Sequence, residues 1–211
     1  GLGDNDIAQN KKVINGTVLE LMAQSEAFVK RNIQTGISVE NGGTRTFEYP
    51  ERLIRECINN SLAHRDYSIN QFINIRIVPG KHIEIKNPGR FKSQLLIVDI
   101  AEGNPIPIRR IVPNNPKANN PKLAKILSVF SKWEGSGLGM ATVIGACLDD
   151  KIDVPYYIFT SDTLSLFIPK GKLVDENMNS LFESYSGYIT EKLGEQITAD
   201  QKKILSYFYK S

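Results

Sequence analysis

The chain has 211 residues, of which 41% are hydrophobic and 23% charged, and its formal net charge at pH 7 is +3. This composition is typical of a globular protein of one or two domains, and no run of about 18 apolar residues exists to cross a membrane. We therefore expect a soluble, cytoplasmic protein without a membrane partner. Its net positive charge is smaller than that of a dedicated nucleic-acid-binding domain, so nucleic-acid binding is permitted but not indicated.

The first residues, Gly1 to Lys12, contain neither a Met nor the apolar core of a signal peptide. We interpret them as a disordered linker or tag at the start of a trimmed fragment. Cys57 and Cys147 both fall within helical apolar patterns, and the chain contains only two His. Reduced, buried thiols are therefore expected, in preference to a disulfide or a metal site.

The first predicted helix begins after Thr17, a suitable N-cap, and covers residues 18–32, where apolar residues recur at intervals of three and four positions. Two short β-like runs follow, separated by the hairpin signal Asn41-Gly42-Gly43. Pro50 predicts the start of a second helix, because its fixed φ suits a first turn. A half-buried hairpin is expected next, with its turn at Pro79-Gly80 and with Ile83 and Ile85 facing inward.

The strand after that turn is predicted to break at Asn87-Pro88-Gly89, and a long irregular loop rich in Pro and Asn then continues to Asn120. Two further helices are predicted, one from Pro121 and one from about Met140, followed by two strands over residues 154–169. Residues 171–197 are polar and read as a connector with some helix. Thr198 and Gln201 form a capping-box pattern before an amphipathic helix, which resembles the first helix of a truncated winged-helix domain.

The stretch His64-Arg65-Asp66, followed by Asn70, resembles the catalytic loop of protein kinases. The kinase pattern needs four residues between its Asp and its Asn, and only three lie between Asp66 and Asn70. The chain also lacks the glycine loop, the strand lysine and the Asp-Phe-Gly segment that act together on phosphates. A kinase is therefore excluded, and a helix end is the favoured interpretation of this motif.

Glu56 and Asn60 stand four residues apart on the helix that follows Pro50, so they should share one edge of its apolar stripe. Their side chains would face the same small space. The amide oxygen can ligate a hard divalent ion, and the carboxylate can orient or deprotonate a water. The alternative is structural: Glu56 pairs with a basic neighbour and Asn60 caps a strand end.

The sequence Gly-Ser-Gly-Leu-Gly-Met, residues 135–140, places three glycines at alternate positions before a helix. Glycines allow a ligand to approach the backbone, and the free amides of a helix N-terminus attract phosphate. A tight turn that needs positive φ would explain one or two of these glycines. Three at alternate positions favour a phosphate-binding turn.

Together these blocks resemble the GHKL ATP-binding superfamily, which includes gyrase, sensor histidine kinases and MutL. The order of the blocks YPERLIRECINNSLAHRDYS, IEIKNPG, NNPKLAKIL and EGSGLGM is similar to the C-terminal-like family named after the ATP-dependent DNA helicase RecG. Such domains occur in bacterial transcriptional regulators, between a Schlafen-like AlbA domain and a winged helix. The resemblance covers residues 13–170. It implies an α/β (α+β) two-layer sandwich of Bergerat type, with a mixed, mainly antiparallel sheet and helices on one face.

The resemblance also implies roles for individual residues. Glu56 matches the acid that activates water, and Asn60 matches the Mg²⁺ ligand. The phosphate-binding positions fall at Gly135, Gly137, Leu138 and Gly139. The superfamily reads adenine with an Asp-x-Gly-x-Gly block, and this chain has Asn87, Gly89 and Phe91 at the three specified positions.

Two functional hypotheses follow. The first is an ATP- and Mg²⁺-binding regulatory domain of a DNA-binding transcriptional regulator, which leaves open a weak ATPase activity with Glu56 as the base. The second is a degenerate domain that binds no nucleotide and acts as a dimerisation or interaction module, motivated by Asn87 and Phe91. A helicase motor is excluded, because the chain has no P-loop. The expected divisions are residues 1–12, 13–170, 171–197 as connector and 198–211 as the truncated helical domain.

Overall fold

A computed structural model of the chain describes residues 11–38, 44–90, 95–97, 101–108, 111–113, 118–130 and 139–210. The helices in this part of the chain are α1 Val18–Asn32, α2 Glu51–His64, α3 Pro121–Phe130, α4 Gly139–Asp150, α5 Glu176–Ser184, α6 Ser186–Leu193 and α7 Ala199–Lys210. The strands are β1 Gln34–Ser38, β2 Thr44–Phe47, β3 Asn74–Val78, β4 His82–Pro88, β5 Leu95–Ile97, β6 Ile106–Pro107, β7 Ile111–Pro113, β8 Tyr156–Phe159 and β9 Thr163–Pro169.

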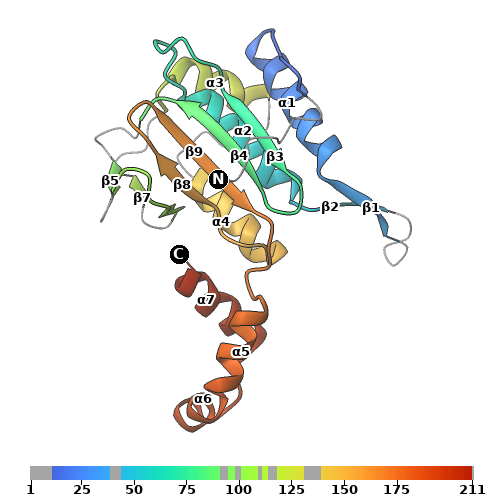
Figure 1. The fold of residues 1–211 in the computed structure, drawn as a ribbon, viewed down its shortest axis with the longest axis vertical. Helices are drawn as coiled ribbons and strands as arrows, with labels where there is room; N and C mark the ends of the chain where they lie inside the picture. The colour runs from blue at the N-terminus through green and yellow to red at the C-terminus, as the bar shows by residue number, and fades with distance from the viewer. Residues whose placement is uncertain are drawn as a thin grey trace, which may run out of the picture.

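The main sheet has five strands in the order β3-β4-β9-β8-β6, and each described pair of neighbours is antiparallel. Two hairpins, β3-β4 and β8-β9, meet where β4 pairs with β9. Helices α2, α3 and α4 cover one face of this sheet, while β1-β2 projects to one side (Figure 1). The predicted α/β two-layer sandwich with helices on one face is confirmed. Its sheet, expected to be mixed and mainly antiparallel, is antiparallel in every described pair.

The core lies between the sheet and α2. Strand residues alternate between the two faces, so Ile83 and Ile85 of β4 point toward the helices together with Leu166 and Ile168 of β9. Helix α2 packs against α1, α3, α4 and β4, and apolar residues cover several of its faces. Each fully buried side chain of the size of Ile or Leu contributes about 1.5–3 kcal/mol. α2 carries more buried residues than any other described helix, so packing restrains its buried side chains.

The predicted helix starts agree with the structure. Thr17 and Glu20 form a capping box on α1, in which the Thr17 amide donates to Glu20 Oε2 at 2.7 Å. A second reciprocal pair precedes α7, where the Thr198 amide donates to Gln201 Oε1 at 2.8 Å. Pro50 is the N-cap of α2. The two capping boxes satisfy amides that the first turn of a helix leaves without a partner, whereas Pro50 makes no side-chain cap hydrogen bond.

The two cysteines are free and buried, as predicted. Burial raises the pKa of the Cys147 thiol to about 12 and raises that of Cys57 well above its ordinary value. Both thiols therefore stay protonated at neutral pH and serve the packing of α2 against α4.

The region predicted as one irregular loop before Asn120 contains the short strands β5, β6 and β7, and β6 joins the main sheet through Ile106 and Tyr157. Asn87 and Pro88 do not break β4, because they still pair with Leu164 and Thr163 of β9. The pairing of β1 with β2 agrees with the predicted hairpin. Its turn at residues 41–43 and the residues 1–10 lie outside the described part of the chain.

Residues 171–197, predicted as a connector with some helix, are mostly helical, since α5 and α6 occupy them. With α7 they extend from one end of the sandwich (Figure 1). Lys210, at the end of α7, pairs with Asp153 at 3.3 Å and Asp175 at 2.8 Å. The apolar stripe of α7 is about half exposed over Ile204, Leu205 and Phe208. No helix in the described part of the chain has the length and apolar character needed to span a membrane.

Candidate functional site

The candidate site begins with two polar side chains on α2. The helix brings Glu56 and Asn60 together, and Asn60 Nδ2 donates to Glu56 Oε1 at 3.1 Å. Glu56 is only 5% exposed, although the edge of an amphipathic stripe would leave it half buried. The cover comes from α4, whose first residue lies directly above the pair. A carboxylate so far from water needs compensating hydrogen bonds, and Asn60 supplies one.

Gly139, the first residue of α4, makes this approach possible. A Cβ at this position would lie 2.5 Å from Glu56 Oε1 and 3.1 Å from both Nδ2 and Oδ1 of Asn60. A contact below 3.0 Å is closer than real Cβ atoms come, so only glycine fits without a shift. The N-terminus of α4, where first-turn amides have no partner within the helix, therefore lies against the Glu56–Asn60 pair.

This arrangement combines three chemical properties. The helix N-terminus carries a partial positive charge and free N–H donors, which suit an anion such as a phosphate. The side-chain nitrogen of Asn60 donates to Glu56, which leaves Asn60 Oδ1 as the atom of this amide that can accept a hydrogen bond or ligate a cation. Glu56 offers a carboxylate that can accept a proton from a water.

Tyr157, on β8, is a buried side chain near Glu56. Burial raises the pKa of Tyr157, and the neighbouring Cys57 and Glu56 raise it further. The phenol therefore remains protonated beside the carboxylate. Sequence reasoning missed Tyr157, and the available signal was its alternation along β8, which turns Tyr157 toward the helices and Tyr156 away from them.

A second polar position lies where β4 ends. Asn87 is 9% exposed and shares the helix-facing side of β4 with Ile83 and Ile85. Its Oδ1 is buried and has no hydrogen-bond partner among the described residues. A buried polar group without a hydrogen-bond partner costs about 1–3 kcal/mol, so Asn87 lowers the stability of the fold.

Gly89 follows at φ +120°, a backbone conformation that side chains disfavour. A Cβ there would lie 3.1 Å from Cβ of Asp66, while the Asp66 amide donates to the Pro88 carbonyl at 3.1 Å. The end of β4 is thereby joined to the turn that closes α2.

We expect Gly89→Ala to lower the free energy of unfolding by about 2–4 kcal/mol, from backbone strain and from the contact with Asp66. Gly80→Ala is the matched control, because Gly80 also has positive φ, +74°, but a Cβ there meets nothing within 4 Å. Its cost should stay near 1 kcal/mol. Urea unfolding of both variants measures the difference, and equal losses would contradict a specific contact between Gly89 and the Asp66 turn.

The His64-Arg65-Asp66-Tyr67 segment makes the contacts of a helix terminus. Arg65 Nη2 donates to the Gln71 carbonyl at 2.5 Å and its guanidinium lies 4.7 Å from the centre of the Tyr67 ring. Asp66 Oδ1 accepts from the amide and the hydroxyl of Ser68, and Tyr67 Oη donates to the Leu62 carbonyl at 3.1 Å. These contacts support the interpretation of the motif as a helix end.

Two asparagines that precede α3 complete the cap of α2. Asn120 Nδ2 donates to the carbonyls of Ala63 at 3.0 Å and Arg65 at 2.8 Å, and Asn119 Nδ2 donates to that of His64 at 2.7 Å. The last carbonyls of a helix have no partner within the helix, so side-chain amides satisfy them here. The C-terminus of α2 therefore joins the end of β4 to the start of α3.

The Asn120 cap gives a specific prediction. Asn120→Asp preserves the side-chain volume but replaces the donor by a carboxylate that repels both carbonyls, so we expect a loss of about 2–3 kcal/mol of unfolding free energy. Asn119→Asp, with one carbonyl partner on a more exposed side chain, should cost about half as much. Thermal unfolding above pH 6 compares the two, and an unchanged Asn120→Asp protein would contradict the cap.

The structure thus brings Glu56, Asn60 and Gly139 together, and it places Asn87 and Gly89 beside the far end of α2. Gly135, Gly137, Leu138 and Phe91 lie outside the described residues. Within the described part of the chain, no group of three or more His, Cys, Asp or Glu side chains forms a metal cluster. A divalent ion at this site would therefore rely on Asn60, on phosphate and on water, which is the ligand set that Mg²⁺ commonly accepts.

Comparisons with known proteins bear on the fold alone. No model of a protein family matches the sequence, and no curated protein matches it. Among solved structures, the chain is similar to the DIP2311 protein from Corynebacterium diphtheriae, with a TM-score of 0.55 and 15% sequence identity. The match covers 90% of this chain but only 40% of that one. The chain therefore shares its fold with less than half of a longer protein.

Proposed function

We propose that this chain is a nucleotide-binding regulatory domain that takes ATP with Mg²⁺. The observation that carries the proposal is the approach of Gly139, at the N-terminus of α4, to the Glu56–Asn60 pair, where any larger residue would require the side chain of Glu56 or Asn60 to shift. An anion-attracting helix end, a carboxylate and a free amide oxygen then face one space. That combination suits a phosphate chain with its counterion.

The spacing along α2 supports the same ligand. Glu56 and His64 are about 12 Å apart along the helix axis at the usual rise per residue. The phosphate-attracting groups lie near Glu56. Asn87, whose Oδ1 has no partner among the described residues, precedes Pro88, whose carbonyl accepts from the Asp66 amide at the end of α2. The two polar positions are thus separated by a distance suited to the phosphates and the base of one extended nucleotide.

Each residue has a defined task in this proposal. The amides of the first turn of α4 bind a terminal phosphate, and Asn60 Oδ1 ligates the ion while its Nδ2 fixes Glu56. Bound Mg²⁺ supplies charge neutralisation of the phosphate oxygens. Glu56, held in a site with little water, is placed to take the proton of an attacking water if the nucleotide is hydrolysed.

The resemblance to GHKL-type domains extends the proposal to a bacterial transcriptional regulator. In such an arrangement the nucleotide domain reports the presence of its ligand to DNA-binding segments, and a net charge of +3 does not require this domain itself to grip DNA. The half-exposed apolar stripe on α7 agrees with a helix that completes its packing against another helical segment or chain.

Calorimetric titration with a non-hydrolysable ATP analogue, with and without Mg²⁺, tests the proposal. We expect saturable binding that weakens at least tenfold when Mg²⁺ is removed. The absence of heat at millimolar nucleotide, in a protein whose circular dichroism shows it to be folded, would refute the nucleotide site.

That second result would favour the alternative function, a dimerisation or interaction module without nucleotide. The observation in its favour is the exposed stripe of Ile204, Leu205 and Phe208 on α7. Sedimentation equilibrium distinguishes the two functions. A dimer that is indifferent to ATP and is broken by Leu205→Asp would support the interaction module.

A further inference from the structure

Asn87 differs in its hydrogen bonding from Asn60 and Asn120. Asn60 directs its Nδ2 to Glu56, and Asn120 directs its Nδ2 to two carbonyls. Asn87 is nine-tenths buried, yet its Oδ1 has no partner among the described residues. Such a group can accept a hydrogen bond from a ligand that reaches it.

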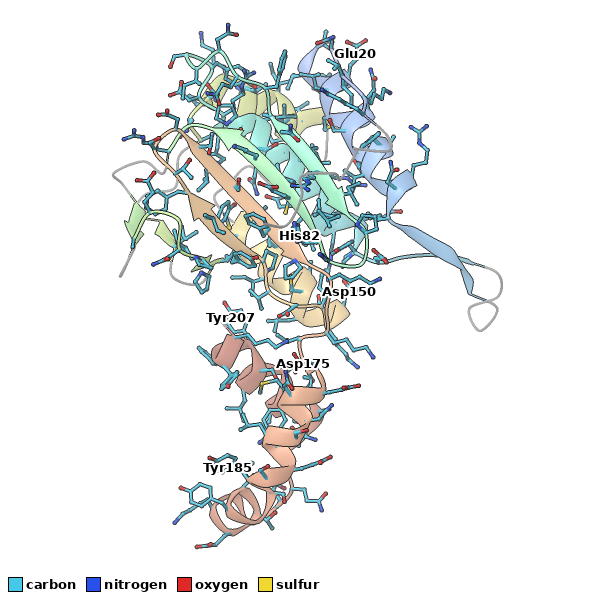
Figure 2. The ribbon with its side chains drawn as sticks, viewed as in Figure 1. Glu20, His82, Asp150, Asp175, Tyr185 and Tyr207 are labelled. Atoms are coloured by element: carbon cyan, nitrogen blue, oxygen red, sulfur yellow. The ribbon has the colours of Figure 1, made fainter. Side chains whose placement is uncertain are left out.

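The sheet residues nearest to Asn87 offer its amide no side-chain hydrogen bond. On the helix-facing side of β4 it follows Ile83 and Ile85, and across the sheet it pairs with Leu164. None of these three side chains carries a hydrogen-bonding group, so none fixes which end of the amide faces a ligand. By contrast, His82 and Glu84 occupy the opposite face of β4, where Figure 2 shows His82 on the side of the sheet away from the helices.

A neutral amide presents one acceptor and one donor side by side. Its complement is an edge that also carries one donor and one acceptor, as in the 6-amino group and N1 of adenine or in O6 and N1–H of a 6-oxopurine. Rotation of the amide by 180° exchanges the two ends. One asparagine can therefore match either edge, whereas an aspartate at the same place offers acceptors alone and repels O6.

We infer that Asn87 is a base-reading residue that makes the site accept both 6-amino and 6-oxo purine nucleotides. The inference rests on the proposed nucleotide site and specifies its substrate class: purine nucleoside triphosphates without strict selection for adenine. The discriminating group is the side-chain amide itself, and exchange of a single atom, in Asn87→Asp, should convert the site to one that selects adenine.

The test compares the dissociation constants of non-hydrolysable ATP and GTP analogues, and of ITP, in the presence of Mg²⁺. For the native chain we expect all three within about fivefold. For Asn87→Asp we expect ATP to be retained within about fivefold and the two 6-oxo nucleotides to weaken by about 10- to 100-fold, which is the effect of one unmatched buried polar contact. ITP lacks the 2-amino group of GTP, so parallel behaviour of these two assigns the effect to O6.

Three results would overturn the inference. If the native chain binds ATP but prefers it to ITP by more than 30-fold, the inference fails while the nucleotide site stands. The inference also fails if Asn87→Asp leaves the ratio of ATP to ITP affinity unchanged. If the native chain binds no nucleotide, the proposed function itself fails. The comparison on the native chain needs no variant, so it remains decisive even if the buried aspartate of Asn87→Asp impairs folding.

Discussion

Replacement of Asn60 by Ala is expected to weaken Mg²⁺-dependent nucleotide binding by about 10- to 100-fold, because it removes the amide oxygen placed for the ion and the donor that fixes Glu56. The fold should persist, since Asn60 is only partly buried and contributes no apolar packing. Isothermal titration with and without Mg²⁺ measures the change. An Asn60→Ala protein that keeps the native affinity and the native Mg²⁺ dependence would remove Asn60 from the site.

Glu56→Gln is the matched variant, because Gln keeps an oxygen that can accept from Asn60 Nδ2 but cannot act as a base at neutral pH. We expect binding within about threefold of the native chain. Any ATP turnover should fall by about 10²- to 10⁴-fold, the usual contribution of a general base. Equal losses of binding and turnover would instead assign Glu56 a structural role.

Gly139→Ala is expected to abolish the site by a steric route. The new methyl group would meet Glu56 Oε1 at 2.5 Å and both terminal atoms of Asn60 at 3.1 Å, so either the pair must separate or α4 must retreat. Overpacking of this kind costs about 1–3 kcal/mol of unfolding free energy. Nucleotide binding should weaken by at least tenfold, because the helix N-terminus and the Asn60 oxygen no longer face one space.

Gly145→Ala serves as the control on the same helix. Gly145 lies in the interior of α4, and a Cβ there meets nothing within 4 Å. Alanine should therefore stabilise the protein, by up to about 1 kcal/mol, and leave nucleotide binding unchanged. Thermal unfolding and titration of the two variants form one experiment. If Gly139→Ala were as stable and as active as Gly145→Ala, the close approach of α4 to Glu56 would be wrong.

Much of this fold could be predicted because its signals are local. The capping boxes at Thr17 and Thr198 depend on residues three positions apart, and the hairpin turn at Gly80 depends on one glycine with positive φ. The shared edge of Glu56 and Asn60 follows from the helical period alone. Each of these features can be predicted without knowing which other elements pack against it.

The remaining features depend on tertiary contacts. The burial of Glu56 arises because α4, more than 80 positions later, closes over it, and no periodicity within α2 carries that information. Asn59 is 0% exposed, more deeply buried than Asn60, because several elements surround α2 where one apolar stripe was expected. The caps supplied by Asn119 and Asn120 likewise join residues 55 or more positions apart.

The most direct test of the nucleotide site is a two-dimensional amide NMR spectrum recorded during titration with the Mg²⁺ complex of a non-hydrolysable ATP analogue. We predict that the largest shift changes occur at the first-turn amides of α4, from Gly139 to Ala141, and at the side-chain amide of Asn60. Gly145, on the same helix, should change little. Unchanged signals at Gly139 and Asn60 at saturating ligand would contradict the proposed site. Shift changes confined to residues around His82, on the other face of the sheet, would contradict it as well.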